Sequence, residues 1–189
     1  MNRLYFIRHG KTAGNELKRY IGRTDEPLSP AGRGELAGKT APQADIVAVS
    51  PLRRCRESAQ ILYPHASLLA VDGLRECDFG DFEGKNYLEL AGNAAYQAWI
   101  DSNGTLPFPH GEAPLAFRAR CVRAFEEFAG GLQEGQSAAL VVHGGTIMAI
   151  FAALALPKRE FYDWQIENGQ GFCAVWDGKA LTVEGKLWQ

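Results

Sequence analysis

Residues 4–10 of the chain read Leu-Tyr-Phe-Ile-Arg-His-Gly, and residues 140–145 read Leu-Val-Val-His-Gly-Gly. Each stretch is an apolar run, typical of a buried strand, that ends in a histidine: His9 in the first and His143 in the second. In a sheet of parallel strands, the carboxyl ends deliver their side chains to one crevice. The two stretches therefore predict that His9 and His143 share a site with Arg8 and Gly144.

Further strands and helices alternate along the chain. Apolar runs predict strands over residues 4–8, 45–50, 67–71, 138–143 and 171–177, with an edge strand over 180–185. Helices are predicted over residues 30–39, 52–63, 87–101, 114–129 and 145–156, the first with Ser29 as N-cap and Pro30 at its first position. This order predicts an α/β fold, a three-layer α/β/α sandwich around a mostly parallel sheet. We expect residues 1–189 to form a single domain.

The composition is that of an ordinary soluble enzyme. The chain has 46% hydrophobic residues, 22% charged residues and a formal net charge of −2. This charge gives no general attraction to nucleic acid or to an anionic membrane, and we expect neither as a partner. No signal peptide or membrane-spanning stretch is expected, and the four scattered cysteines predict reduced thiols, no metal site and a cytoplasmic location. The oligomeric state stays open, a homodimer included.

Four predicted strand ends carry groups suited to phosphate ester chemistry. They supply Arg8 and His9, the arginines after Ser50-Pro51, Glu76, and His143. Arginine matches phosphate oxygens with its planar fork, and a helix start such as Gly144-Gly145 adds backbone N–H donors. A histidine can act as nucleophile, and a carboxylic acid can protonate the leaving group. Taken singly, each group also fits a structural reading: Arg53, Arg54 and Arg56 as a solvated helix face, His143 as a hydrogen-bonded core residue.

Five separated motifs resemble those of the histidine phosphatase superfamily, the phosphoglycerate mutase-like enzymes. Residues 8–15 resemble R-H-G-x-T-x-x-N, residues 22–32 resemble G-x-x-D-x-P-L-[ST]-x-x-G, and residues 50–59 resemble S-P-L-x-R-x-x-x-[ST]-A. Residues 74–84 resemble L-x-E-x-x-F-G-x-[WF]-E-G, and residues 143–145 resemble the second histidine motif. The resemblance extends over nearly the whole chain.

The resemblance implies a role for each matched residue. It makes His9 the phosphorylated nucleophile and Glu76 the acid and base. It selects Arg54 over Arg53 for phosphate binding. The other implied phosphate-binding groups are Arg8, Asn15, His143 and Gly144, and Gly22 is implied to contact the substrate. No metal or other cofactor is implied.

The superfamily contains both mutases and phosphatases. Cofactor-dependent phosphoglycerate mutases are longer and carry basic residues directly after the catalytic glutamate, whereas Cys77-Asp78 follows Glu76 here. No Lys or Arg occurs between Lys85 and Arg118. The absence of a cationic ring for a bisphosphate favours hydrolysis of a small-molecule phosphate monoester. The alternatives are a phosphoglycerate mutase and a non-catalytic protein that binds a phosphorylated ligand.

Within the phosphatases, the length and residues 79–84 are most similar to the alpha-ribazole phosphatases, which act on a nucleotide-like intermediate of cobalamin assembly. One departure is Ala113, which stands where relatives often have serine after Gly111-Glu112. The aromatic residues that could stack on a base-like leaving group, or pack in the core instead, are Tyr87, Tyr96, Trp99 and Phe108. His110 has a weak case for touching a substrate, and His65 is expected at the surface.

Overall fold

A computed structural model describes residues 1–188. The strands are β1 (Asn2–Arg8), β2 (Ile46–Val49), β3 (Leu68–Ala70), β4 (Ser137–Val142), β5 (Ala155–Leu156), β6 (Gly171–Trp176) and β7 (Leu181–Lys186). The α-helices are α1 (Ala13–Glu16), α2 (Pro30–Ala37), α3 (Arg53–Leu62), α4 (Ala94–Asp101), α5 (Pro114–Gly130) and α6 (Gly144–Leu154). Short 3₁₀ helices are η1 (Asp72–Leu74), η2 (Gly80–Phe82) and η3 (Phe161–Trp164).

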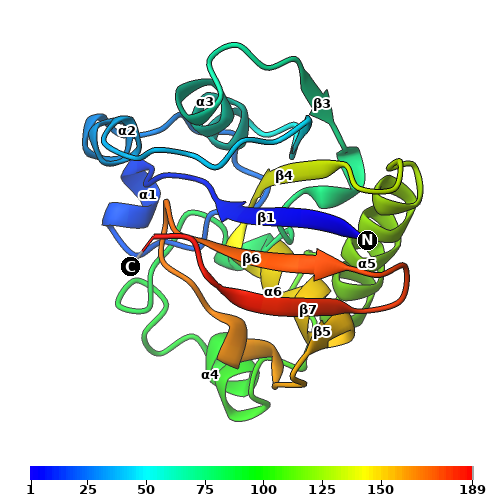
Figure 1. The fold of residues 1–189 in the computed structure, drawn as a ribbon. Coiled ribbons are helices and arrows are strands. Elements are labelled where there is room, and N and C mark those ends of the chain that lie inside the picture. Colours follow the sequence, from blue (N-terminus) through cyan, green and yellow to red (C-terminus); the bar gives the residue numbers. More distant parts are fainter. Residues whose placement is uncertain (189) are drawn as a thin grey trace.

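The strands form one sheet in the order β3-β2-β4-β1-β6-β7-β5 (Figure 1). β6 runs antiparallel to both neighbours, and the other described pairings are parallel. The register pairs Arg8 with Val142, and Val49 with both Val141 and Ala70. The carboxyl ends of β1, β4, β2 and β3 therefore meet at one edge, as the sequence predicts.

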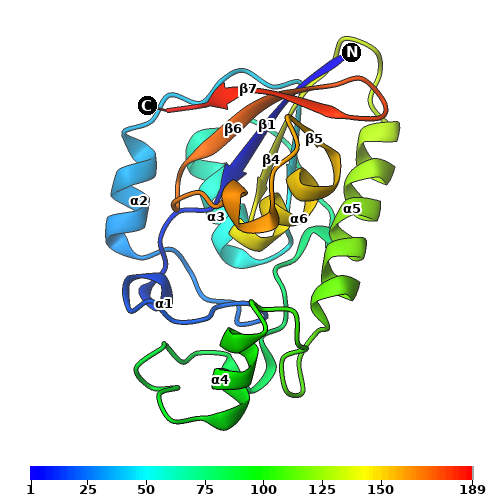
Figure 2. The same cartoon turned by 90° about the horizontal axis from the view of Figure 1, so that it is seen from below.

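Helices cover both faces of the sheet because its central strands are apolar on both sides. Along β4, Ala138, Leu140 and Val142 belong to one buried cluster, whereas Ala139 and Val141 belong to the other. Successive strand residues point to opposite faces, so a continuous apolar run needs cover on each. Helices α5 and α6 pack on the first cluster, and α2 and α3 on the second (Figures 1 and 2). The predicted three-layer α/β/α sandwich is confirmed.

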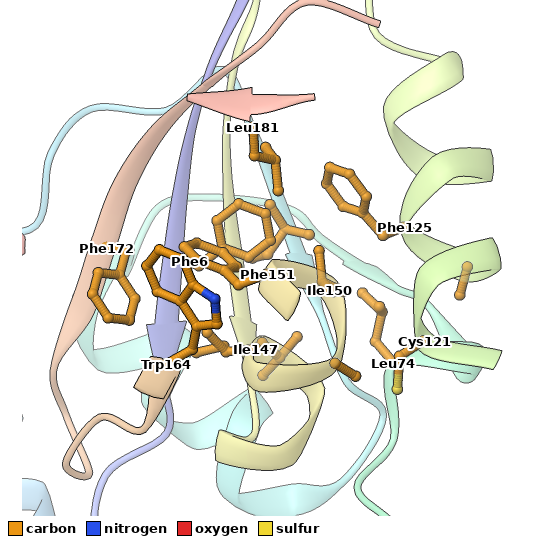
Figure 3. Close-up of a cluster of buried hydrophobic side chains, with 14 of the residues drawn as sticks. Phe6, Leu74, Cys121, Phe125, Ile147, Ile150, Phe151, Trp164, Phe172 and Leu181 are labelled. Atoms are coloured by element: carbon orange, nitrogen blue, oxygen red, sulfur yellow. The ribbon is translucent and has the colours of Figure 1, made fainter. Parts of the chain in front are cut away.

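The larger cluster is built around Phe6 of β1 (Figure 3). The Phe6 ring lies edge-on to Phe151 of α6 at 4.8 Å and 5.5 Å from Phe125 of α5. Phe151 also contacts Trp164 of η3 and Phe172 of β6, each at 5.2 Å between ring centroids. This packing fixes the helix whose first residues follow His143, and so fixes one wall of the site.

Some boundaries differ from the prediction. The helix predicted over 87–101 begins only at Ala94, because Gly92 takes a positive φ of 80° and the Asn93 side chain caps the helix by accepting from the Tyr96 N–H. The edge strand predicted over 180–185 corresponds to β7, but only part of β7 lies at the edge of the sheet. The two-residue strand β5, which the sequence analysis placed in a helix, pairs with Leu181 and Thr182 outside it.

The excursion between η2 and α5, which we call the α4 lobe (residues 83–113), lies beyond the carboxyl ends of the strands. Figure 2 shows α4 on the side toward which the β1 arrow points. Tyr20, which follows α1, holds this lobe: its ring contacts Trp99 at 6.0 Å, and its hydroxyl lies 3.1 Å from that of Tyr96. The lobe therefore covers the edge where the predicted site residues gather.

The aromatic core makes a stability prediction. Replacing Phe151 with Ala should lower the free energy of unfolding by about 3–5 kcal/mol, because a fully buried ring is lost and its neighbours relax only partly. The control is Leu115→Ala on α5, a side chain that is 77% exposed and should change stability by less than about 0.5 kcal/mol. Urea unfolding measures both. Equal losses in the two variants would contradict the packing described here.

Candidate active site

His9 lies immediately after β1, is 3% exposed and is held as a neutral ring. Its Nδ1 lies 2.7 Å from the Gly10 carbonyl oxygen, which can only accept, so Nδ1 carries the proton. Burial, followed by the charges of Arg54 and Arg8, holds the His9 pKa well below its ordinary value. The Nε2 atom is therefore unprotonated and keeps its lone pair, as a nucleophile requires.

Arg54 is a fully buried cation that contacts this lone pair. Its Nε donates to His9 Nε2 at 3.3 Å. The guanidinium is fixed by backbone carbonyls: Nη1 donates to Thr24 O at 2.7 Å and Nη2 to Gly22 O at 2.8 Å. Arg53 and Arg56 on the same helix are exposed. The resemblance thus picked the one arginine of the three that reaches the interior, which helical spacing alone could not do.

Arg8 contributes a second guanidinium, which is partly buried. Its Nη1 donates to the Ile166 carbonyl at 2.7 Å, but its Nε is buried and has no hydrogen-bond partner among the residues that the structure describes. A Cβ added to Gly144 would lie 3.2 Å from this Nε, so the arginine lies against the start of α6. A buried donor without a partner is costly unless a ligand accepts from it.

Asn15 sits in α1 with its amide oxygen already occupied. Oδ1 accepts from the Thr12 N–H and from Asn168 Nδ2, both at 3.2 Å, which leaves the Asn15 NH₂ group for another acceptor. Asn168 also donates to the His9 carbonyl at 3.2 Å. Sequence reasoning missed Asn168, since it lies in an irregular loop whose pairing with β1 no local pattern reveals.

Gly22 supports the site through its backbone. Its carbonyl holds Arg54, and a Cβ on it would lie 1.9 Å from the Cys77 carbonyl, so only glycine fits between the two loops. Gly22 does not line the cavity, described below, whose wall contains Arg8, Asn15 and Glu76. Glu83, another residue that the analysis gave no role, fixes this loop: its Oε1 accepts from the N–H groups of Gly22 at 2.7 Å and Thr24 at 2.9 Å.

His143 directly follows β4 and lies beside His9. Its ring centroid lies 5.2 Å from that of His9, and its Nε2 lies 2.7 Å from the Ser50 hydroxyl. Burial and then Arg54 hold the His143 pKa well below its ordinary value. The Cys55 thiol lies 3.5 Å from the same Nε2, and burial raises its pKa to about 12. Cys55 is therefore a protonated packing residue at neutral pH.

Glu76 faces the same point from the loop after η1. Its Oε1 accepts from the Cys77 N–H and its Oε2 from the Gly145 N–H, both at 3.0 Å. These bonds and the charges of Arg54 and Arg8 favour the carboxylate, but burial outweighs them and raises the Glu76 pKa above its ordinary value. A carboxyl group with a raised pKa is suited to donate a proton.

These side chains lie at one end of a cavity of about 260 Å³. Arg8, Asn15, Glu76, Gly144 and Gly145 line this end, while His9, Arg54 and His143 lie buried beneath it. The opposite wall is aromatic. Of the four aromatic residues considered for stacking, Trp99 and Phe108 line the cavity, whereas Tyr96 packs behind them and Tyr87 is exposed.

The two remaining histidines lie away from this centre. His65 is exposed. His110 does not line the cavity, and its Nδ1 lies 3.1 Å from the Asp81 carboxylate at the surface. Within residues 1–188 there is no group of three or more His, Cys, Asp or Glu placed to hold a metal ion. None of the helices described here has the length and apolarity needed to cross a membrane.

Comparison with known proteins agrees with this geometry. Residues 4–186 match the model of the histidine phosphatase superfamily, branch 1. The chain is 32% identical to glucosyl-3-phosphoglycerate phosphatase of Mycobacterium tuberculosis over 89% of this chain and 81% of the relative. It is 29% identical to adenosylcobalamin/alpha-ribazole phosphatase of Salmonella typhimurium over 88% and 87% of the two chains. The crystal structure of the alpha-ribazole phosphatase from Shigella flexneri superimposes with a TM-score of 0.82 at 25% identity, covering 97% and 95%.

The chain therefore belongs to the histidine phosphatase superfamily, as the resemblance of its motifs indicates. The relatives named above are all phosphatases by name: one of glucosyl-3-phosphoglycerate and two of alpha-ribazole phosphate.

The buried histidines make a prediction about stability and pH. Both have pKa values well below about 6.5, so below that pH the unfolded chain binds protons that the folded protein does not. The free energy of unfolding should fall as the pH drops from 7.5 toward 5. The raised pKa of Glu76 acts in the opposite direction, because the folded state then binds the extra proton.

The contribution of His143 can be isolated by substitution. His143→Gln should have a shallower pH slope than the wild type, by up to about 1.4 kcal/mol per pH unit for one proton. His65→Gln, at an exposed position, should keep the wild-type slope. Urea unfolding at several pH values provides the comparison. Parallel curves for wild type and His143→Gln would mean that His143 is not held neutral.

Proposed function

We propose that the protein is a metal-independent phosphomonoesterase that hydrolyses a small organic phosphate through a phosphohistidine at His9. The observation that carries this proposal is the neutral His9 Nε2 in contact with the buried Arg54 guanidinium, with the charge of Arg8 also acting on the ring. Within the described residues neither guanidinium has a carboxylate within 4 Å, and Arg8 Nε has no hydrogen-bond partner. A phosphate group would supply both the missing acceptor and the missing negative charge.

The first step forms the covalent intermediate. His9 Nε2 attacks phosphorus, an N–P bond forms and the P–O bond to the leaving group breaks. The ring becomes positively charged, and the Gly10 carbonyl, which accepts from Nδ1–H, stabilises that charge. Arg8, Arg54, Asn15 and His143 are proposed to hold the phosphoryl oxygens, together with the Gly144 N–H at the start of α6.

Glu76 is proposed to move the protons in both steps. Its raised pKa favours the carboxylic acid, which gives its proton to the departing alkoxide. The resulting carboxylate then removes a proton from water as the water oxygen attacks phosphorus and the N–P bond breaks. Orthophosphate leaves, and His9 and Glu76 return to their starting states.

The substrate is expected to be a small molecule. The cavity of about 260 Å³ is near the lower limit of ligand pockets, about 300 Å³. The relatives act on chemically different phosphates by name, and alpha-ribazole 5'-phosphate is one candidate that the aromatic wall can accept.

His9 is tested by its removal. His9→Ala should lower hydrolysis of p-nitrophenyl phosphate at least about a thousandfold in buffer containing EDTA, because the nucleophile is lost. Wild type incubated with a ³²P-labelled ester and quenched in alkali should retain acid-labile label that His9→Ala lacks.

His110→Ala is the matched control, since His110 lies at the surface outside the cavity. Equal activity in wild type and His9→Ala would refute the mechanism. Conversion of 3-phosphoglycerate to 2-phosphoglycerate that depends on bisphosphoglycerate and outpaces phosphate release would favour the mutase alternative.

The acid role of Glu76 depends on the leaving group. Glu76→Gln should lower kcat/KM for an alkyl phosphate by about 10²–10⁴, because kcat/KM reports the step that forms the phosphohistidine and the alkoxide needs a proton there. It should affect p-nitrophenyl phosphate much less, since p-nitrophenolate leaves without one. Glu127→Gln, at an exposed position of α5, should leave both rates unchanged. Similar losses on the two substrates would remove Glu76 from the acid role.

A further inference from the structure

The cavity carries a feature that hydrolysis of the phosphate does not use. Away from the phosphate end it is lined by aromatic side chains: Phe79 just before η2, Trp99 and Phe108 of the α4 lobe, Phe117 of α5 and Phe161 of η3. These residues leave a slot for the body of the leaving group. Arg19 and Arg118 add a positive charge at this part of the wall.

The two arginines differ in what surrounds them. Arg19 is fully paired: its Nε and Nη2 donate to the two carboxylate oxygens of Glu89 at 3.2 and 2.9 Å. Arg118 has no hydrogen bond and no carboxylate within 4 Å in the part of the chain that the structure covers. Its guanidinium carbon lies instead over the Phe161 ring, 3.9 Å from the ring centroid. A contact with the ring face uses no hydrogen-bond acceptor, so the N–H donors of Arg118 stay open to a ligand.

A neighbouring depression reinforces this charge. Arg118 and Phe161 also line a second hollow, together with Lys158, Arg159 and Glu160. Neither Lys158 nor Arg159 forms an ion pair with any residue of the described range; Lys158 Nζ donates to the Ala153 carbonyl at 2.6 Å. Glu160, the acid of this group, caps η3 by accepting from the Asp163 N–H. The hollow thus has an excess of positive charge, to which Arg118 itself contributes.

We propose that Arg118 is a specificity residue that binds a second anionic group on the leaving group. Resting on the proposed phosphatase function, this makes the substrate a phosphate monoester whose alcohol carries an aromatic or apolar body and a distal carboxylate. The body fills the aromatic slot while the carboxylate accepts from Arg118, with Lys158 and Arg159 adding attraction. Such a substrate ranks above alpha-ribazole 5'-phosphate, whose one acidic group is the phosphate.

A matched pair of esters tests the anion directly. Phloretic acid phosphate and phloretamide phosphate differ in a carboxylate against a carboxamide, far enough from the phenol to leave its acidity unchanged. Wild type should prefer the acid about tenfold in kcat/KM, the size of one lost charge-assisted hydrogen bond in a partly exposed site. Arg118→Met should abolish the preference by lowering activity on the acid alone, and Arg118→Lys should restore part of it.

Controls separate this role from a structural one. Arg123→Met removes an exposed arginine from the same helix and should keep the tenfold preference. Hydrolysis of p-nitrophenyl phosphate, which has no distal carboxylate, should be the same in wild type and Arg118→Met, as should the melting temperature.

Two results overturn the inference in distinguishable ways. Equal rates on the acid and the amide by wild type, with His9-dependent hydrolysis of p-nitrophenyl phosphate intact, would reject the anion site and leave the proposed function standing. Absence of any His9-dependent hydrolysis would reject the proposed function and the inference with it.

Discussion

The structure of the site depends on burying the Arg54 guanidinium without a carboxylate partner. Moving a cation out of water is costly, and here backbone carbonyls of the 21–24 loop compensate for the loss. The positive charge therefore stays uncompensated at the His9 ring, where it attracts an anion and adds to burial in holding the His9 pKa low. Glu83 holds the loop, Ser58 accepts from Gly10, and Asn168 holds His9, so several surrounding contacts serve to keep these groups in place.

The sequence was most informative where one physical cause dominates. Apolar runs such as residues 138–142 have to be buried on both faces. This requirement predicts both the strands and the helical layers that cover them. Gly92 and the cap at Asn93 shortened a helix whose apolar pattern begins earlier. β5 has only two residues, too few to show a hydrophobic period in the sequence, and its pairing with β7 depends on tertiary packing.

The site residues also fall into those that the sequence pattern predicts and those that it does not. His9, Glu76 and His143 follow strands or lie just after one, so topology brings them together. Choosing Arg54 over Arg53 needed the family motif. The two residues are adjacent and point to different sides of the helix, and a helix whose predicted ends are uncertain by one or two residues does not show which side faces the interior. Asn168 and Arg118 could not be found this way. Asn168 acts through a long-range contact with His9, just after β1. Arg118 is distinguished by its contact with Phe161 and its lack of an acidic partner in the described structure, neither of which a local sequence pattern reveals.

The phosphate end and the leaving-group end come from different parts of the chain, yet Tyr20 and Glu83 connect them. Tyr20 contacts the α4 lobe through its ring and hydroxyl, and Glu83, at the root of that lobe, anchors the loop beneath Arg54. Exchanging the whole lobe for that of a relative would therefore loosen the arginine as well as reshape the slot. Chimeras that exchange ligand preference should retain residues 83–85 and graft only the residues beyond Lys85.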